Sequence, residues 1–320
     1  MKAVVVTEYG GPEVLHVAEV PEPHAGPGRV RVRVKAAAVN PSDTLFRTGA
    51  VRQLVSDAVP HPLRPGMDLA GVLDEVGEGT ATDLRIGESV MGTVSPIDAT
   101  GGAYAEYVVL DPRQVTRAPA GATHVEAATI PMNGLTARLS LDLLGLPRGS
   151  SVLVTGGAGA VGGYVIELAK ADGLEVITDA SAADAPLVRQ LGADVVLPRG
   201  TRMADAAHTV RPAGVDAVID TALIGGPVAT TLRTGGQLAI LRAIGERGMP
   251  TMSLGADVTV REVFVPEYRF ADDKLDQLRV AAEEGIISMR VAGVYPAEDA
   301  AAAHRRFEAG GVRGRLVLTF

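Results

Sequence analysis

The chain has 320 residues, no cysteine and a formal net charge of −8. This length exceeds what one small core needs, so about two domains are expected. The lack of cysteine excludes disulfides, thiolate zinc sites and cysteine nucleophiles, and the acidic balance argues against a nucleic-acid partner, which requires a basic face.

The N-terminal residues carry no recognisable targeting segment. Met1–Val6 is short and strand-like, and no basic region precedes an apolar run. Nowhere does an uninterrupted apolar stretch approach the ~18 residues that a membrane span needs. We therefore expect a soluble, cytoplasmic protein.

The first third of the chain has the pattern of an antiparallel β domain. Residues Arg29–Lys35 alternate, with Val30, Val32 and Val34 on one face and basic residues on the other. Such alternation predicts a strand with one buried face and one solvent-exposed face. Turn-forming residues separate three further predicted strands, Ala70–Val76, Ser89–Val94 and Tyr104–Val109.

The pattern changes near Thr123, where an alanine-rich helical run begins. From Ser151 onward, short apolar strands alternate with helical segments, which predicts a parallel sheet with helices on both faces. The predicted strands are Val152–Val154, Glu175–Thr178, Asp194–Val196, Ala217–Ile219 and Gln237–Leu241.

Beyond Phe264 the chain returns to the mixed pattern of its opening. The predicted elements there are a helix over Asp272–Glu284, a strand over Val291–Val294, a helix over Ala297–Phe307 and a strand over Gly314–Leu318. We therefore assign residues 1–123 and 266–320 to one domain and residues 124–265 to an inserted nucleotide-binding domain.

The most informative stretch is VLVTGGAGAVG at residues 152–162, which is typical of a strand, a glycine turn and a helix start. Its G-x-G-x-x-G spacing, with Asp179 ~20 residues later, matches the dinucleotide fingerprint. There the first glycine permits a tight turn, the second lets the backbone approach a pyrophosphate, and the third lets helix and strand pack closely. A structural turn without a ligand is the alternative. The predicted cofactor-binding residues of the turn are Gly157, Gly159, Ala160, Val161 and Gly162.

Further motifs accompany this turn: NPSD at 40–43, PGMDLAG at 65–71, GAYAEY at 102–107, GLTA at 134–137, AHRRFE at 303–308 and GRLVL at 314–318. Together they resemble the zinc-free quinone oxidoreductase (zeta-crystallin-like) branch of the medium-chain dehydrogenase/reductase superfamily. The resemblance covers almost the whole chain. It implies an α/β fold class: a GroES-like antiparallel β catalytic domain, built from both chain ends, plus an inserted Rossmann doubly wound parallel sheet.

No metal site is predicted. Zinc alcohol dehydrogenases of this superfamily have a cysteine where Asn40 stands and Gly-His-Glu where Gly66-Met67-Asp68 stand. The six histidines are scattered, without the i, i+4 pairing of helical metal ligands.

Without zinc, oxidation of simple alcohols lacks the Lewis acid that stabilises an alkoxide. Hydride addition to an electron-poor conjugated acceptor stays feasible, because hydrogen bonds can stabilise the resulting enolate or hydroquinone anion. We therefore predict hydride transfer from NADPH or NADH to a small-molecule quinone or α,β-unsaturated carbonyl.

Asn40 and Asn133 are the predicted catalytic residues. The Asn40 amide could hold the nicotinamide ribose or polarise a substrate carbonyl, and the alternative is a loop asparagine that caps the turn before Pro41. Asn133 could donate to a substrate oxygen, although a cap at a helix start explains it equally. Asp43 is expected to be structural and Tyr104 to pack, so no general acid is identified.

Three further residues are placed near the cofactor by the resemblance. Thr136 belongs to the GLTA motif, while Leu241 and Arg242 stand at the end of the fifth predicted Rossmann strand. Arg242 could clamp an acidic or carbonyl-bearing substrate, or it could be a solvated surface arginine.

The choice between NADH and NADPH stays open in the sequence. NADPH is usual in the family, yet Asp179 ends the second strand, where a carboxylate binds ribose hydroxyls and repels a 2′-phosphate. Asp184 stands where relatives often carry a phosphate-binding lysine. Against this, Ser181 offers a hydroxyl and Arg199 a cation to a 2′-phosphate.

Two other functions are weighed against this prediction. One is an enoyl-thioester reductase of polyketide or fatty-acid metabolism, which shares the fold and the hydride step. The other is a dinucleotide-binding structural protein without enzymatic activity. The resemblance also implies a homodimer joined through edge strands, for which Gln237–Leu241 and Asp257–Val263 are candidates.

Overall fold

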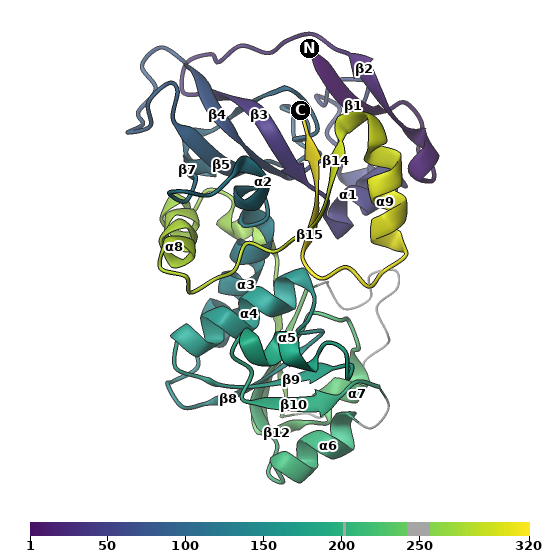
Figure 1. Cartoon of the computed structure of the whole chain (residues 1–320), viewed down its shortest axis with the longest axis vertical. Coiled ribbons are helices and arrows are strands. Elements are labelled where there is room, and N and C mark those ends of the chain that lie inside the picture. Colours follow the sequence, from purple (N-terminus) through teal and green to yellow (C-terminus); the bar gives the residue numbers. More distant parts are fainter. Residues whose placement is uncertain (201–202, 242–256) are drawn as a thin grey trace. The chain divides into compact units, whose positions relative to one another are not determined.

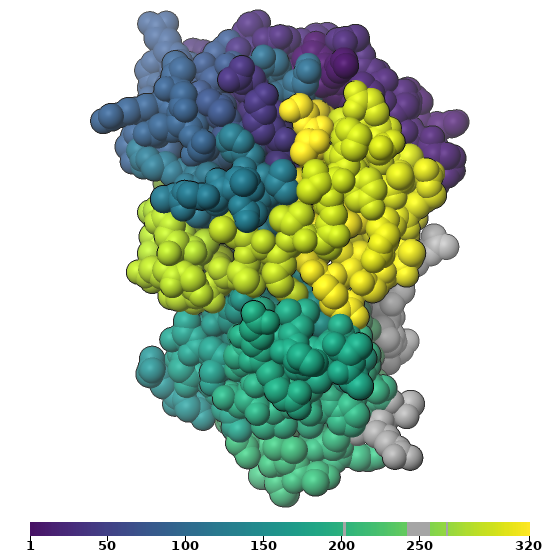
Figure 2. Space-filling view, in the orientation of Figure 1, coloured from purple at the N-terminus to yellow at the C-terminus, as the bar shows by residue number. Residues whose placement is uncertain are grey.

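The structure is a computed structural model that describes residues 1–200, 203–241 and 257–320. These residues form two compact units: Met1–Met132 with Tyr268–Gly285 and Met289–Phe320, and Asn133–Glu267 with Ile286–Ser288. Figure 2 shows the N-terminal and C-terminal segments, in purple and yellow, together in the first unit. The predicted fold class, a β unit built from both chain ends plus an inserted Rossmann sheet, is confirmed.

The main sheet of the first unit has the strand order β14-β15-β3-β4-β5-β7, and β6 also pairs with β3. All of these pairs are antiparallel except β14 with β15. Because β15 pairs with β3, the C-terminal tail completes the sheet that the N-terminal third begins. The strands are β3 (Val30–Ala38), β4 (Asp68–Val76), β5 (Ser89–Thr93), β6 (Tyr107–Leu110), β7 (Val115–Arg117), β14 (Val291–Pro296) and β15 (Arg315–Thr319).

Smaller elements surround this sheet. A two-stranded sheet pairs β1 (Lys2–Val6) with β2 (Leu15–Glu19). The helix α2 (His124–Ala127) packs on β3, β4 and β5, so it lies in the first unit, although the sequence placed residues from 124 onward in the inserted domain. The remaining helices of this unit are α1 (Pro41–Arg47), α8 (Asp272–Glu283) and α9 (Ala300–Glu308), and its 3-10 turns are η1 (Pro12–Val14), η2 (Arg52–Leu54), η3 (Pro112–Gln114) and η5 (Ala297–Asp299). A further 3-10 turn, η4 (Val265–Tyr268), spans the point where the chain passes from the second unit to the first.

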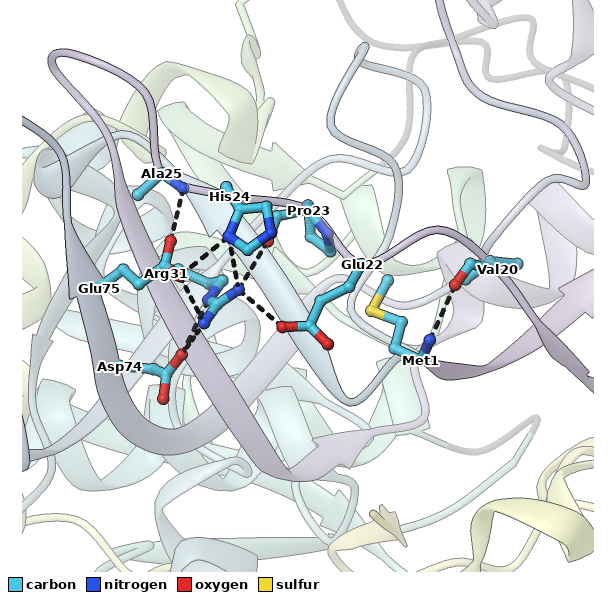
Figure 3. Close-up of polar contacts among 9 residues, drawn as sticks. All are labelled: Met1, Val20, Glu22, Pro23, His24, Ala25, Arg31, Asp74 and Glu75. Carbon is cyan, nitrogen blue, oxygen red and sulfur yellow. Dashed lines mark hydrogen bonds and ion pairs between the residues drawn. The ribbon is translucent and has the colours of Figure 1, made fainter.

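One side chain on the predicted solvent-exposed face of β3 is buried. The guanidinium of Arg31 donates from Nε to Asp74 Oδ2 at 2.8 Å and from Nη1 to Glu22 Oε1 at 2.9 Å (Figure 3). It also lies 4.7 Å from the centre of the Tyr107 ring. The expectation of a wholly exposed basic face was therefore wrong at Arg31, because acidic partners on β4 and in the preceding loop compensate the buried charge.

The second unit is a six-stranded parallel sheet in the order β10-β9-β8-β11-β12-β13. Figure 1 shows helices α4 (Ala160–Ala171) and α5 (Ala185–Gln190) on one face and α6 (Met203–Val210) on the other. From β8 the chain builds the sheet outward through β9 to β10, and it then crosses over to β11 on the other side of β8. This change in strand order between β8 and β11 is the switch point at which such folds bind dinucleotides. The other elements are α3 (Pro131–Leu144), α7 (Gly226–Ala229), β8 (Ser151–Thr155), β9 (Glu175–Ala180), β10 (Val195–Pro198), β11 (Val215–Asp220), β12 (Leu232–Ile240) and β13 (Thr259–Glu262).

The strand β12 has neighbours on both sides, β11 and β13. Gln237–Leu241 was therefore a wrong candidate for an edge strand, because its backbone groups are already paired. Of the two candidate segments, only the one that contains β13 lies at an edge of the described sheet. No helix within the described part of the chain is long and apolar enough to span a bilayer.

Candidate cofactor and active site

The glycine turn connects the fully buried strand β8 to α4. Its left-handed residue is Gly156, with φ of 65°, one position before the fingerprint triplet. Gly159 is the N-cap of α4, in an extended conformation and without a side-chain cap. The tight turn that the sequence analysis attributed to Gly157 is thus made at Gly156, because only that residue has the conformation that favours glycine.

The three fingerprint glycines have different neighbours. A Cβ atom on Gly157 would lie 2.2 Å from Thr178 Oγ1, and one on Gly162 would lie 2.4 Å from the main-chain oxygen of Gly156. A Cβ on Gly159 would meet only that same oxygen, at 3.1 Å. Gly157 and Gly162 therefore let β9, the turn and α4 pack closely. Gly159 places no side chain at the helix N-terminus, where a pyrophosphate binds in such folds.

Asp179, near the end of β9, is tied to this turn. Its Oδ1 accepts a hydrogen bond from Gly156 N at 2.6 Å, and its Oδ2 accepts one from Arg199 Nε at 2.9 Å. Asp179 is 2% exposed. Since β9 and β10 are parallel, with Leu197 opposite Asp179, Arg199 emerges directly beside the carboxylate.

The other two residues of the predicted ribose region join the same cluster. The Ser181 hydroxyl donates to Asp184 Oδ2 at 2.7 Å and accepts from Asp184 N at 3.2 Å. Asp184 Oδ2 also lies 3.9 Å from Arg199 Nη1. The structure therefore brings Asp179, Ser181, Asp184 and Arg199 together, with the Ser181 proton already donated to a carboxylate.

The remaining predicted cofactor residues of the second unit are more scattered. Ala160 and Val161 form the half-buried first turn of α4, and Leu241 is half-buried directly after β12. Asn133 and Thr136 are three residues apart on α3, hence on one face of that helix. Asn133 is buried and Thr136 half-buried. Arg242 lies outside the described residues.

In the first unit, Asp43 organises the segment around Asn40. Asp43 is fully buried and accepts hydrogen bonds from Asn40 N at 2.8 Å, Gly66 N at 3.1 Å and the Tyr104 hydroxyl at 3.0 Å. Burial raises the pKa of Asp43 to about 6, although these donors oppose the rise. Tyr104 is buried as expected, and its hydroxyl also lies 3.3 Å from His304 Nε2.

The side chain of Asn40 is held by Asp68, the first residue of β4. Asn40 Nδ2 donates to Asp68 Oδ2 at 2.9 Å, and the other carboxylate oxygen of Asp68 accepts from Met132 N at 2.8 Å. Asp68 is fully buried, and burial raises its pKa to about 7 against the opposing effect of these donors. A carboxyl group that titrates near neutral pH therefore lies next to the predicted catalytic amide.

Sequence reasoning gave no role to two of the carboxylates found here. Asp68 stood in the PGMDLAG motif and in the comparison with zinc alcohol dehydrogenases, but its contact with Asn40 joins residues 28 positions apart. Asp220, at the end of β11, accepts from Thr155 Oγ1 at 2.6 Å and from Gly225 N at 2.8 Å, and so fixes the loop next to the glycine turn. An acidic residue at the carboxyl end of an apolar strand was the available signal.

No three histidine, aspartate or glutamate side chains are grouped to hold a metal ion among the residues that the structure describes. The positions that correspond to zinc ligands in zinc-dependent members of the superfamily hold Asn40 and Met67. An amide and a thioether are not the imidazole and thiolate groups that zinc sites use.

Comparisons with known proteins agree with this architecture. Residues 26–120 match the alcohol dehydrogenase GroES-like domain, and residues 191–318 match the zinc-binding dehydrogenase domain. The quinone oxidoreductase of Pongo abelii is 30% identical over 99% of this chain and 97% of its own length. A mycobacterial protein solved in complex with NADPH is 29% identical, with a TM-score of 0.85 and full coverage of both chains.

A third relative is matched over a shorter length. The 2-methylene-furan-3-one reductase of Solanum lycopersicum is 32% identical over 75% of this chain, and the match spans 62% of that protein. The antiparallel β unit, the inserted Rossmann sheet and the glycine turn together define a medium-chain dehydrogenase/reductase fold. Within that superfamily, the chain belongs to the quinone oxidoreductase family.

Proposed function

We propose that this protein is an oxidoreductase that transfers a hydride from NADH or NADPH to a small quinone or α,β-unsaturated carbonyl. The observation that carries the proposal is the glycine turn, in which Gly159, without a side chain, is the N-cap of α4 at the switch point of the parallel sheet. Relatives named as a quinone oxidoreductase and as a reductase of an unsaturated ketone support the acceptor class.

The residues of this chain divide the work. The N–H groups at the start of α4 would hold the pyrophosphate of the dinucleotide, and Asp179, which is fixed to the glycine turn, would bind the hydroxyls of the adenosine ribose. A bound reduced nicotinamide supplies the hydride. Asn40 orients the reacting groups, because Asp43 holds its backbone and Asp68 holds its amide. The proton that completes enone reduction comes from water.

The proposal includes zinc independence. It rests on the amide and thioether at Asn40 and Met67, which replace the usual zinc ligands of the superfamily. Conjugated acceptors suit such a site, because their reduction yields a delocalised anion that hydrogen bonds can stabilise.

Turnover tests this function directly. Purified protein treated with a chelator should oxidise NADH or NADPH in the presence of short enones and benzoquinones, and added zinc should not raise kcat. A saturated ketone or a primary alcohol with the oxidised cofactor serves as the negative control. Turnover only with an enoyl thioester would favour the enoyl-thioester reductase instead, and cofactor binding without turnover would favour the structural protein.

We further propose that NADH is the preferred cofactor. The carboxylates of Asp179 and Asp184 both lie beside the guanidinium of Arg199, so a 2′-phosphate placed there would lie next to two acidic groups. A 2′-phosphate brings about −1.5 to −2 further charges. The Ser181 proton is already donated to Asp184, so it is not available to a phosphate without rearrangement.

Michaelis constants measured for both cofactors test this preference. We expect a KM for NADPH at least tenfold above that for NADH. Asp184→Asn should lower the KM for NADPH several-fold and leave the KM for NADH unchanged. Preference for NADPH in the wild type, lost selectively in Arg199→Ala, would show instead that Arg199 turns toward the phosphate.

We also propose a homodimer joined through β13, which lies at one edge of the Rossmann sheet in the described residues, at the opposite end from β10. Three of the four residues of β13 are exposed, and an exposed strand edge offers unpaired N–H and C=O groups to a second copy. Light scattering at micromolar concentration should give twice the mass of the chain, and a monomer mass would contradict the proposal. The cytoplasmic location stays a prediction.

A further inference from the structure

The side-chain amide of Asn40 is hydrogen-bonded through its nitrogen, Nδ2, but not through its oxygen, Oδ1, within the described residues. Nδ2 donates to Asp68 Oδ2 at 2.9 Å and to the main-chain oxygen of Ala38 at 3.4 Å. Oδ1 is buried and has no hydrogen-bond partner among the residues that the structure describes. The Asn40 side chain lies over Asp43 N as in a capping box but falls short of a hydrogen bond, and that N–H donates to the main-chain oxygen of Asn40 at 3.1 Å.

Asp68 determines the orientation of the Asn40 amide. At a pH above its pKa of about 7, Asp68 is a carboxylate that can only accept hydrogen bonds, so it selects the amide orientation in which Nδ2 points toward it and Oδ1 points away. A buried acceptor without a partner is unfavourable, and a ligand that donates a hydrogen bond to Oδ1 would remove this cost.

The chemistry of the ligands identifies the donor. Quinones and enones present carbonyl oxygens, which only accept, so an unpaired acceptor on Asn40 cannot serve them. The dinucleotide carries hydroxyl and carboxamide donors. Of the two roles that the sequence left open for Asn40, the structure therefore favours binding the cofactor over polarising a substrate carbonyl.

We propose that Asp68 is a positioning residue that turns Oδ1 of Asn40 away from itself, so that Asn40 accepts a hydrogen bond from a hydroxyl of the nicotinamide ribose. This inference rests on the proposed function, because it requires a bound nicotinamide dinucleotide. The role of Asp68 is specific to its charge, since a neutral amide of the same shape would reverse the selection.

Asp68→Asn is the decisive variant. Its new amide oxygen can keep the bond from Met132 N, and its new NH₂ group then faces Asn40. The Asn40 amide should flip to present Oδ1 to that group, which turns the Asn40 donor toward the ligand. We expect the Kd for NADH, measured by calorimetry without any acceptor, to rise about tenfold, with a cooperative thermal unfolding transition retained.

A double-mutant cycle separates positioning from a general structural effect. Asn40→Ala should raise the Kd by a similar factor, and Asp68→Asn added to Asn40→Ala should raise it no further. Asp68→Glu, which keeps an acceptor at this position, should recover part of the affinity. Additive effects of the two substitutions, or an unchanged Kd in Asp68→Asn, would overturn the inference.

The 3-acetylpyridine analogue of NAD distinguishes the two kinds of donor, because it retains the ribose hydroxyls and lacks the carboxamide NH₂. Asp68→Asn should also raise the Kd for this analogue about tenfold. An unchanged Kd for the analogue would assign the donor to the carboxamide and overturn the ribose assignment. A wild-type protein that binds neither NADH nor NADPH would contradict the proposed function as well. Normal wild-type binding with an unaffected variant would overturn only the role of Asp68.

Discussion

Asp68 in the first unit and Asp179 in the second are both shielded from solvent, at 0% and 2% exposure, but their partners differ. Asp179 is paired with the guanidinium of Arg199 as well as a backbone N–H. Within the described part of the chain, Asp68 receives hydrogen bonds from an amide and a backbone N–H, and burial raises its pKa to about 7. The second unit thus holds a carboxylate with a paired cation, whereas the first holds carboxyl groups whose charge changes near neutral pH.

The largest effect should come from breaking the turn that Asp179 supports. In Gly162→Ala the new Cβ would lie 2.4 Å from the main-chain oxygen of Gly156, so α4 must shift away from the turn. We expect the Kd for NADH to rise at least a hundredfold, as measured by calorimetry. Gly226→Ala is the matched control in the same unit, because its Cβ would meet nothing within 4 Å. Near-normal affinity in Gly162→Ala would contradict the assignment of the turn.

Replacing the buried carboxylate of Asp43 in the first unit should lower the free energy of unfolding. Three donors converge on Asp43, and Asp43→Asn replaces one acceptor oxygen with an NH₂ group that faces them. We expect a loss of about 2–4 kcal/mol in the free energy of unfolding, measured in urea at pH 7. A loss below about 0.5 kcal/mol would show that these contacts contribute little to folding.

The pH dependence of stability should reveal the titration of Asp68. Its folded pKa, about 7, lies above the unfolded value, so the native state binds this proton more tightly. The stability from this group is complete below about pH 4 and falls as the pH rises toward 7, by up to about 1.4 kcal/mol per pH unit. Asp68→Asn should therefore be most destabilising near pH 4 and progressively less so toward pH 8.

Other groups near Asp68 also influence this profile. Asp43 raises the pKa of Asp68, Arg315 lowers it, and Tyr104 is coupled to both carboxyl groups. The difference between the unfolding free energies of wild type and variant therefore reports the titration of Asp68 together with its electrostatic effect on Asp43 and Tyr104. A difference that does not change between pH 4 and pH 8 would contradict the raised pKa.

The smallest effect is expected at Ser181. Its hydroxyl donates to Asp184, so Ser181→Ala removes a local turn contact rather than a cofactor contact. The KM for NADH should change less than twofold, and stability should fall by about 0.5–1.5 kcal/mol. A tenfold rise in the KM for NADPH would instead identify Ser181 as a ligand of the 2′-phosphate and contradict the claim that Asp184 engages its hydroxyl.

Local patterns in the sequence were sufficient for much of this fold. The valines of β3, the apolar strand before the glycine turn and the helix after it follow from periodicities of two and 3.6 residues, which depend on near neighbours alone. The capping box at Thr123 likewise marks the start of α2, where Glu126 N donates to the Thr123 hydroxyl at 3.2 Å.

The contacts that define the site depend on pairing between distant segments, which no local pattern contains. Arg31 is buried because β4 brings Asp74 beside it, 43 residues away. Asp179 meets Gly156 across 23 positions. Asn40 was identifiable as a polar residue in a motif, but its orientation is set by Asp68, whose place next to it depends on the folded sheet.

The central claim is that this protein passes a hydride directly from the nicotinamide to a conjugated carbon. The most direct test is reduction of an enone with NADH that is deuterated at the transferred C4 position, in buffer of ordinary water with a chelator, followed by NMR of the product. The account predicts deuterium at the carbon β to the carbonyl and a proton from water at the α carbon. Cofactor oxidation that leaves the β carbon without deuterium would contradict it.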